Sequence, residues 1–254
     1  MGGAGTGSPH LDRRPSPART PVVRSLAPGP LPDPLPPPGA AAELWLLREH
    51  HDADFSLLDP AERDRAARTR PGPARTAYAA AHTALRRLLG AYTGTPPASV
   101  RLTRDDCPLC GSPHGRPRLA DRNGPHFSLS HAPGLTLLAF AATPVGVDVE
   151  AVPGPATVAA IARGLHPIER RELAALPVAD RPAAFARAWA RKEAYLKGLG
   201  TGLARPLHLD YVGTGPVAPP PPDPDWTLDD IPLRPTAPAR TAALALLRGG
   251  DGRR

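Results

Sequence analysis

Cysteine and aromatic residues are scarce in this chain of 254 residues. The two cysteines, Cys107 and Cys110, lie too close together in sequence to act as a disulfide framework, which favours a reducing compartment. No apolar run approaches the roughly 18 residues of a membrane span, and residues 1–21 lack the apolar segment of a signal peptide. We therefore expect a soluble cytoplasmic protein that does not bind a membrane.

Positive charge is abundant, but almost all of it is arginine. The formal charge of +7 predicts an anionic partner, which on charge alone could be a nucleic acid, a phosphorylated cofactor or an acidic protein. Of the 31 basic residues only Lys192 and Lys197 are lysines. A lysine ammonium can give up its proton whereas an arginine guanidinium cannot usefully do so, and both lysines lie in one helical segment. We interpret them as functional, although biased codon usage would also explain the pattern.

Composition divides the chain into a tail and two ordered regions. Residues 1–40 are rich in Pro, Gly and Arg, which predicts a disordered tail with order beginning at Ala41. Hydrophobic periodicity and turn signals predict helices at residues 61–70, 75–89, 155–164, 167–175 and 180–199. They predict strands at residues 41–50, 99–104, 126–131, 135–142, 145–150, 207–212 and 241–247.

This order of elements predicts an α+β fold. We expect two similar halves, residues 41–143 and 144–248, each a small antiparallel sheet packed with helices. Proline-rich residues 213–239 are expected to form an exposed insertion with Trp226 on the surface, and residues 249–254 a short tail. In the first half, Trp45 should point inward from the first strand, and Gly90 should end the second helix.

Two acidic residues share one face of a predicted strand. In VGVDVE, residues 145–150, alternation places three valines on one face and Gly146, Asp148 and Glu150 on the other. Exposed acids are common, so this pattern alone is also typical of a solvated strand. Near the middle of a sheet, however, paired carboxylates repel each other unless a cation neutralises them, and Mg²⁺ prefers such oxygen ligands.

A helix with charges inside its apolar stripe follows. In AFARAWARKEAYLK, Trp189, Lys192, Glu193 and Lys197 recur at helical spacing with Leu196. Taken alone, Glu193 and Lys197 are an ordinary surface pair at positions i and i+4.

The two segments together resemble a known family. GVDVE followed by WARKEAYLK, with HGRPRL at residues 114–119, FSLSH at 127–131 and the basic segment LDPAERDRAARTR upstream, resembles the surfactin-type branch of the 4′-phosphopantetheinyl transferase superfamily. The resemblance covers residues 44–212. It implies a single chain of two pseudo-symmetric α+β halves with the active site at their junction.

The resemblance also implies an activity. Such enzymes transfer the phosphopantetheine arm of coenzyme A to a serine of an acyl, peptidyl or aryl carrier protein and release adenosine 3′,5′-bisphosphate. Asp148, Glu150 and Glu193 match the Mg²⁺ ligands, with Mn²⁺ as an alternative ion. Glu193 also matches a general base and Lys197 a residue that assists the leaving group. A monomeric enzyme of secondary metabolism, acting without nucleic acid, is expected by analogy.

Further residues match positions that bind coenzyme A. His131 matches a histidine that contacts its phosphates, and Ser130 could donate a hydroxyl to the same phosphate. Arg116 stands where the family most often has lysine before Pro117, and arginine can bind a phosphate through two hydrogen bonds. The remaining candidates for phosphate contacts are Lys192, Arg65 and Arg75, of which Arg65 could equally lie on a solvated helix face.

The CxxC pair allows two interpretations. Cys107, Cys110 and His114 resemble half of a zinc knuckle, but a structural zinc site takes four ligands and no second CxxC occurs. A turn with two free thiols is therefore favoured. Two other functions share the charge and the acids, namely a different Mg²⁺-dependent phosphoryl transferase or nuclease, and a basic nucleic-acid binding module. The second would not need three carboxylates beside its basic surface, where they would repel phosphates.

Overall fold

The computed structural model describes residues 21–27, 29, 31–32, 34–48, 53–234 and 238–249. The first region holds β1 (Val23–Ser25), β2 (Glu43–Arg48), α1 (Pro60–Arg68), α2 (Pro73–Thr93), β3 (Leu102–Arg104), β4 (Pro117–Leu119), β5 (His126–Ala132) and β6 (Leu135–Ala141). The second holds β7 (Val145–Ala151), α3 (Pro155–Ile161), α4 (Pro167–Ala175), α5 (Arg181–Leu199), β8 (Trp226–Asp230) and β9 (Arg240–Leu247). Short 3₁₀ turns link them at Phe55–Leu57, Pro97–Ser99, Ala162–Gly164 and Gly202–Ala204. The predicted α+β class is confirmed.

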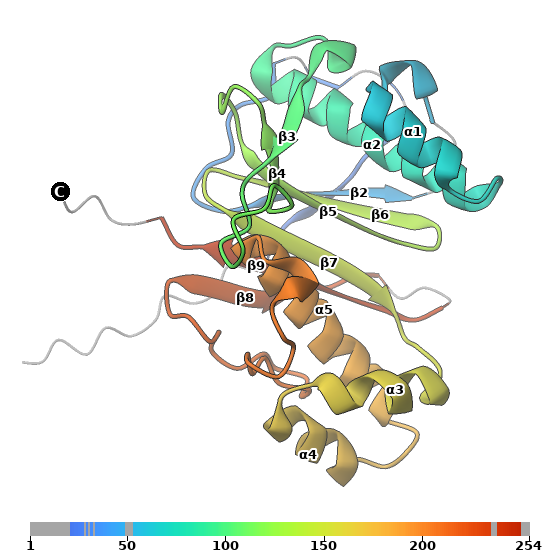
Figure 1. Ribbon diagram of the computed structural model, residues 1–254, viewed down its shortest axis with the longest axis vertical. Helices are drawn as coiled ribbons and strands as arrows, with labels where there is room; N and C mark the ends of the chain where they lie inside the picture. Colours follow the sequence, from blue (N-terminus) through green and yellow to red (C-terminus); the bar gives the residue numbers. More distant parts are fainter. Residues whose placement is uncertain are drawn as a thin grey trace, which may run out of the picture.

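Two main sheets form the centre of the molecule (Figure 1). The first has the strand order β1-β2-β6-β5, antiparallel except that β1 runs parallel to β2. The second is antiparallel with the order β7-β9-β8, and β3 and β4 form a separate hairpin. Each half thus has a sheet and helices of its own, while internal symmetry between the halves remains a prediction.

Alternation along the strands explains how the layers stack. Trp45 and Leu47 of β2 pack toward α2, whereas Leu44 and Leu46 pack with Val147 of β7. On the far side of the second sheet, alanines of β9 pack with Ala190 and Ala194 of α5. The described residues therefore form layers in the order helix, sheet, sheet, helix. Trp45 points inward, as predicted.

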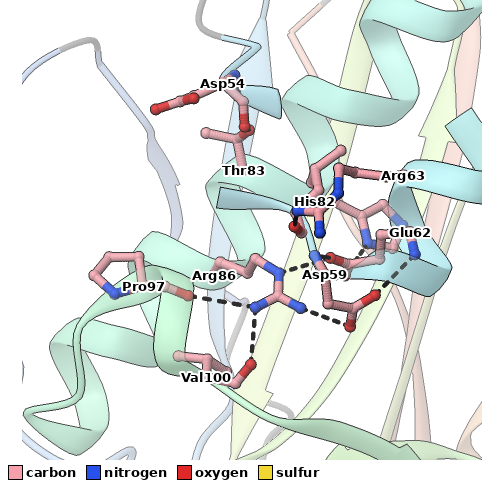
Figure 2. Close-up of polar contacts among 10 residues, drawn as sticks. Asp54, Asp59, Glu62, Arg63, His82, Thr83, Arg86, Pro97 and Val100 are labelled. Carbon is pink, nitrogen blue, oxygen red and sulfur yellow. Dashed lines mark hydrogen bonds and ion pairs between the residues drawn. The ribbon is translucent and has the colours of Figure 1, made fainter. Parts of the chain in front are cut away.

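Helix α1 joins α2 through a buried ionic cluster, shown in Figure 2. Asp59 caps α1 in a capping box with Glu62. The fully buried Arg86 of α2 donates to Glu62 Oε2 at 2.7 Å, to Asp59 Oδ2 at 2.8 Å and to the carbonyl of Val100 at 2.8 Å. Because every charge is paired, the cluster fixes the two helices relative to each other.

The chain is ordered earlier than composition predicts. Leu26 and Leu35 are only 8% and 5% exposed, and their N–H groups bond to the carbonyls of Leu46 and Ala91. Proline is compatible with such extended edge segments, so the spaced leucines can still reach the core. The predicted tail is therefore wrong for these residues, while residues 1–20 and 250–254 lie outside the described part.

Three other boundaries differ from the sequence prediction. Helix α2 continues past Gly90 to Thr93 and ends at Gly94, which has a φ of 64°. Residues 207–212 do not form a strand. Within 213–239, Trp226 begins β8 and is only 4% exposed, so this segment is not wholly an exposed insertion. Among the described residues, no helix combines the length and apolar character that crossing a membrane requires.

Candidate active site

A cleft of about 1010 Å³ lies where the two halves meet. Its walls come from α1, α2, the β3–β4 hairpin, β5, β7 and the C-terminal part of α5. Most of the residues singled out in the sequence line it, namely Arg65, Arg116, Pro117, Ser130, His131, Asp148, Glu150, Glu193 and Lys197. Elements far apart in sequence therefore bring acids and cations to one place.

Strand β7 and helix α5 supply the acidic part. Glu193 and Lys197 are one helical turn apart and face the same cleft as Asp148. Lys197 Nζ lies 2.6 Å from Asp148 Oδ1, which also accepts the hydroxyl of Ser130 at 2.7 Å. Asp148 is only 2% exposed, and its Oδ2 atom is buried with no hydrogen-bond partner.

Burial and, after it, mutual repulsion affect the other two carboxyls. Burial, together with the charges of Asp148 and Glu193, raises the pKa of Glu150 to about 7, although a hydrogen bond from Trp189 and the charge of Lys197 oppose the shift. Burial and the charge of Asp148 also raise the pKa of Glu193. When all three carboxyls are ionised, the group carries more negative charge than Lys197 alone can neutralise.

Two serines of β5 join the sheets at the cleft floor. Ser128 Oγ accepts the N–H of Val147 at 3.1 Å, and Ser130 Oγ accepts that of Val149 at 3.3 Å. These N–H groups belong to β7, an edge strand of its sheet, and the hydroxyls satisfy them. Because Ser130 gives its proton to Asp148, its hydroxyl orients that carboxylate in this structure rather than pointing at an open phosphate position.

Basic side chains also line the cleft. Arg116 donates to the carbonyl of Gly198 at 2.9 Å, so the β3–β4 hairpin rests on the end of α5. His131 is exposed to the cleft, yet desolvation by surrounding atoms and the charge of Lys197 lower its pKa. Arg65, which is exposed on α1, lines the cleft with Arg68 and Arg104, two residues the sequence did not single out. Guanidinium groups at these positions suit an anionic ligand.

Lys192 does not lie at the cleft. It is only 1% exposed and pairs with the buried Glu169 of α4 at 2.8 Å. Its ammonium also donates to the carbonyls of Leu207 and Asp210. Position 192 is next to position 193, about 100° around the helix, which turns it toward α4. The expected phosphate contact therefore has no support here, and Lys192 instead fixes the segment predicted as a strand.

Arg75 also lies away from the cleft lining. Its guanidinium donates to the carbonyls of Ala67 at 2.9 Å and Thr69 at 3.3 Å, at the C-terminal end of α1. There it satisfies carbonyl groups that a helix end leaves free. We therefore assign Arg75 a capping contact in this structure, not the expected phosphate contact.

Tyr78 and His82 are cleft residues that sequence reasoning missed. They lie one turn apart on α2, with ring centroids 4.2 Å apart, and His82 Nδ1 is 2.8 Å from Glu62 Oε1. Tyr78 fits the apolar spacing of this helix. A polar imidazole following it at i+4 was the signal that this face of α2 meets a site rather than only a core.

The residues fit a divalent cation in their chemistry. Carboxylate oxygens are the ligands that Mg²⁺ prefers, and Asp148, whose buried Oδ2 has no hydrogen-bond partner, lines one cleft with Glu150 and Glu193. In this structure Lys197 provides the positive charge beside Asp148. Asp148, Glu150 and Glu193 are thus the residues that would hold the ion.

Comparison with known proteins finds a family whose model matches this part of the chain. Residues 144–227, which carry β7, α5 and the three carboxylates, match the model of the 4′-phosphopantetheinyl transferase superfamily. This confirms, for residues 144–227, the resemblance drawn from the motifs.

Named relatives agree with this assignment. The chain is 33% identical to the 4′-phosphopantetheinyl transferase HetI of Nostoc sp. (strain PCC 7120) over 136 residues, which cover 52% of this chain and 54% of the relative. It is 28% identical to the 4′-phosphopantetheinyl transferase Sfp of Bacillus subtilis (strain 168) over 107 residues, 42% of this chain and 47% of the relative. The chain therefore spans about half the length of the curated relatives it matches.

Proposed function

We propose that this protein transfers the 4′-phosphopantetheine arm of coenzyme A to a serine of an acyl, peptidyl or aryl carrier protein. The observation that carries the proposal is the cleft that combines the superfamily's acidic pair and helix with several basic side chains. Transfer from a pyrophosphate needs positioning of the reacting groups and neutralisation of charge on the oxygens that leave. The basic side chains of the cleft can meet the first requirement. Lys197, together with a cation held by the three carboxylates, can meet the second.

The basic and the acidic side chains have separate tasks in this mechanism. Arg116, His131 and Arg65 bind the phosphates of coenzyme A and orient the pyrophosphate. When bound by Asp148, Glu150 and Glu193, Mg²⁺ supplies charge neutralisation at the pyrophosphate, and Mn²⁺ is an alternative ion.

The reaction itself exchanges one phosphorus–oxygen bond for another. Glu193 accepts the proton of the carrier serine, whose oxygen forms a bond to the phosphorus next to pantetheine. The bond from this phosphorus to the bridging oxygen breaks, and adenosine 3′,5′-bisphosphate leaves. Lys197 lies where its ammonium can stabilise the leaving oxygen. Because coenzyme A carries the activated group, no covalent enzyme nucleophile is required.

Cellular role follows from analogy with the branch. We infer a cytoplasmic, monomeric enzyme that activates carriers of secondary metabolism, either polyketide or nonribosomal peptide synthases. The three acids argue against a nucleic-acid ligand in the cleft, since they repel a phosphate backbone.

The decisive experiment is an intact-mass assay. The full chain is incubated with coenzyme A, Mg²⁺ and each of a panel of apo carriers from polyketide, peptide and fatty-acid systems. A gain of one phosphopantetheine mass on the carrier is expected, with none after chelation of the metal or after replacement of the carrier serine by alanine. Absence of any gain across the panel would overturn the proposal, and the pattern of gains would identify the preferred carriers.

A further inference from the structure

The loop between β3 and β4 brings three metal-ligating side chains together outside the acidic group. Cys107, Cys110 and His114 place their ligand atoms within 4.8 Å of one another, the one such group of three among the described residues. The Nε2 atom of His114 lies 3.0 Å from the Sγ atom of Cys110. Cys107 is buried, whereas Cys110 and His114 are exposed.

Backbone contacts hold this arrangement without a metal. The N–H of Gly111 bonds to the carbonyl of Cys107 at 2.8 Å, and the N–H of Cys107 bonds to the carbonyl of Ser112 at 2.8 Å. Gly111 has a φ of 71°, a left-handed conformation that closes the CPLCG turn at low cost for glycine. The loop is therefore organised before any ligand binds.

Glycine is also required where the loop closes. A Cβ atom at Gly115 would lie 2.6 Å from the carbonyl oxygen of Asp105 and 2.9 Å from that of Asp106. Backbone bonds from Asp105 N–H to the carbonyl of Arg116 and from Gly115 N–H to the carbonyl of Asp105, both 2.9 Å, tie the two ends together. The histidine is thus brought back over the cysteines by a close-packed backbone.

We propose that Cys107, Cys110 and His114 bind one Zn²⁺ ion, with water or an incoming group as the fourth ligand. Two sulfurs and one imidazole nitrogen are a zinc donor set, and hard cations such as Mg²⁺ avoid it. Zinc–sulfur bonds of about 2.3 Å at a tetrahedral centre put the two sulfurs about 3.8 Å apart. Because all three ligand atoms already lie within 4.8 Å of one another, small movements of the side chains would bring them to such a centre. Two thiolates would also neutralise the ion.

The zinc would order a segment that serves the cleft. His114 is followed directly by Gly115, Arg116 and Pro117, all of which line the cleft. Arg116 contacts the carbonyl of Gly198 at the end of α5. A zinc ion bound by His114 would therefore fix the start of this segment and the position of the Arg116 guanidinium. A zinc site would also account for the presence of both cysteines of the chain in this one loop.

Metal content provides the test, and it does not depend on transferase activity. The full chain is purified under reducing conditions, stripped with a chelator, incubated with zinc and passed through gel filtration. Wild-type protein should retain about one zinc per chain, measured by plasma mass spectrometry, while Cys110→Ser and His114→Ala should lose it. Cobalt in place of zinc should give a thiolate-to-metal charge-transfer band that Cys110→Ser removes.

Matched controls separate binding from general damage to the loop. Leu109 is 51% exposed between the two cysteines, and His208 is exposed elsewhere. Leu109→Ala and His208→Ala should both retain the zinc. Zinc should raise the melting temperature of the wild type and of these controls, but not of Cys110→Ser, whose exposed position keeps the fold intact.

Three results would overturn the proposal. The first is wild-type protein that folds, keeps reduced thiols and retains no zinc. The second is zinc retention by Cys110→Ser and His114→Ala equal to that of the wild type. The third is a Cys107–Cys110 disulfide that persists in the reducing conditions used, detected as a loss of two mass units. Such a bond would show that the two cysteines pair with each other instead of binding a metal. A failed carrier assay would leave all three measurements unaffected.

Discussion

Gly146 of β7 lies against the backbone of α5 so closely that a Cβ atom at this position would be 1.9 Å from the carbonyl oxygen of Ala194. It would also be 2.4 Å from the backbone nitrogen of Gly198. Strand and helix therefore touch without an intervening side chain. Because Asp148 follows two residues later on the same strand face, this contact sets how near Asp148 comes to Glu193 and Lys197.

Gly146→Ala should consequently be strongly destabilising. The methyl group meets backbone atoms that cannot rotate away, so β7 and α5 must separate, and overpacking of this kind costs about 1–3 kcal/mol or more. Denaturant unfolding followed by circular dichroism measures the change. Gly154 provides a matched control, since a Cβ atom there meets nothing within 4 Å. Equal stability of the two variants would contradict the backbone contact.

The sequence predicted the acidic site better than its surroundings. Alternation placed Asp148 and Glu150 on one strand face, and helical spacing placed Glu193 and Lys197 one turn apart, because both depend only on local geometry. Directly after Lys197, Gly198 lies close to another segment, since a Cβ atom there would be 2.5 Å from the Trp226 ring.

Contacts between distant segments could not be predicted in the same way. Lys192 belongs to the helical stripe that contains Glu193, and nothing local shows that Glu169 buries it. Trp226 lies in a proline-rich segment, yet pairing with Leu247 of β9 makes it part of a strand. In both cases long-range pairing decides the outcome over local composition.

Replacing Glu193 with glutamine tests the central acid. The substitution keeps size and hydrogen bonding but removes the charge needed by a base or a metal ligand. Transfer should slow by about 100-fold or more, the range typical of a lost general acid or base. Initial rates of holo-carrier formation measure it, while the melting temperature should stay near that of the wild type.

A magnesium titration separates the two roles of Glu193. If the carboxylate is a ligand, Glu193→Gln should require more Mg²⁺ for half-maximal rate, whereas a pure base would leave that requirement unchanged. Asp64→Asn, on the exposed surface of α1, is the charge-matched control and should behave as wild type. Near-normal turnover by Glu193→Gln would remove this residue from the catalytic set.

Lys197→Ala should lower kcat more than it raises the KM for coenzyme A. Its ammonium sits 2.6 Å from Asp148, inside the acidic group, where it can act on charge that develops on the leaving oxygen. Loss of one such donor costs about 100-fold or more. Steady-state kinetics with varied coenzyme A gives both constants.

Two further variants interpret the Lys197 result. Lys197→Arg keeps the charge and should recover part of kcat, while Arg170→Ala on the exposed face of α4 should leave both constants unchanged. A rise in KM with unchanged kcat in Lys197→Ala would instead assign this residue to binding alone.

Acid stability should depend on Glu62 in the ionic cluster of Figure 2. Burial by itself raises the pKa of this carboxyl, but hydrogen bonds with His82, Arg86 and the N–H of Asp59 outweigh it, so the pKa lies below its ordinary value of 4.5. A lowered pKa in the folded state means that the charged form stabilises the protein above pH 4.5. This contribution is lost as the pH falls from there through the folded-state pKa.

Comparison with Glu62→Gln isolates that contribution from the other acids, which titrate in both proteins. The free energy of unfolding should differ most between the two at neutral pH, and the difference should shrink below pH 4.5, measured by urea unfolding at a series of pH values. Asp64→Asn, on the exposed side of the same helix, should show no such convergence. A gap between wild type and Glu62→Gln that stays constant down to the acid transition would mean that Glu62 stabilises by packing and not by its charge.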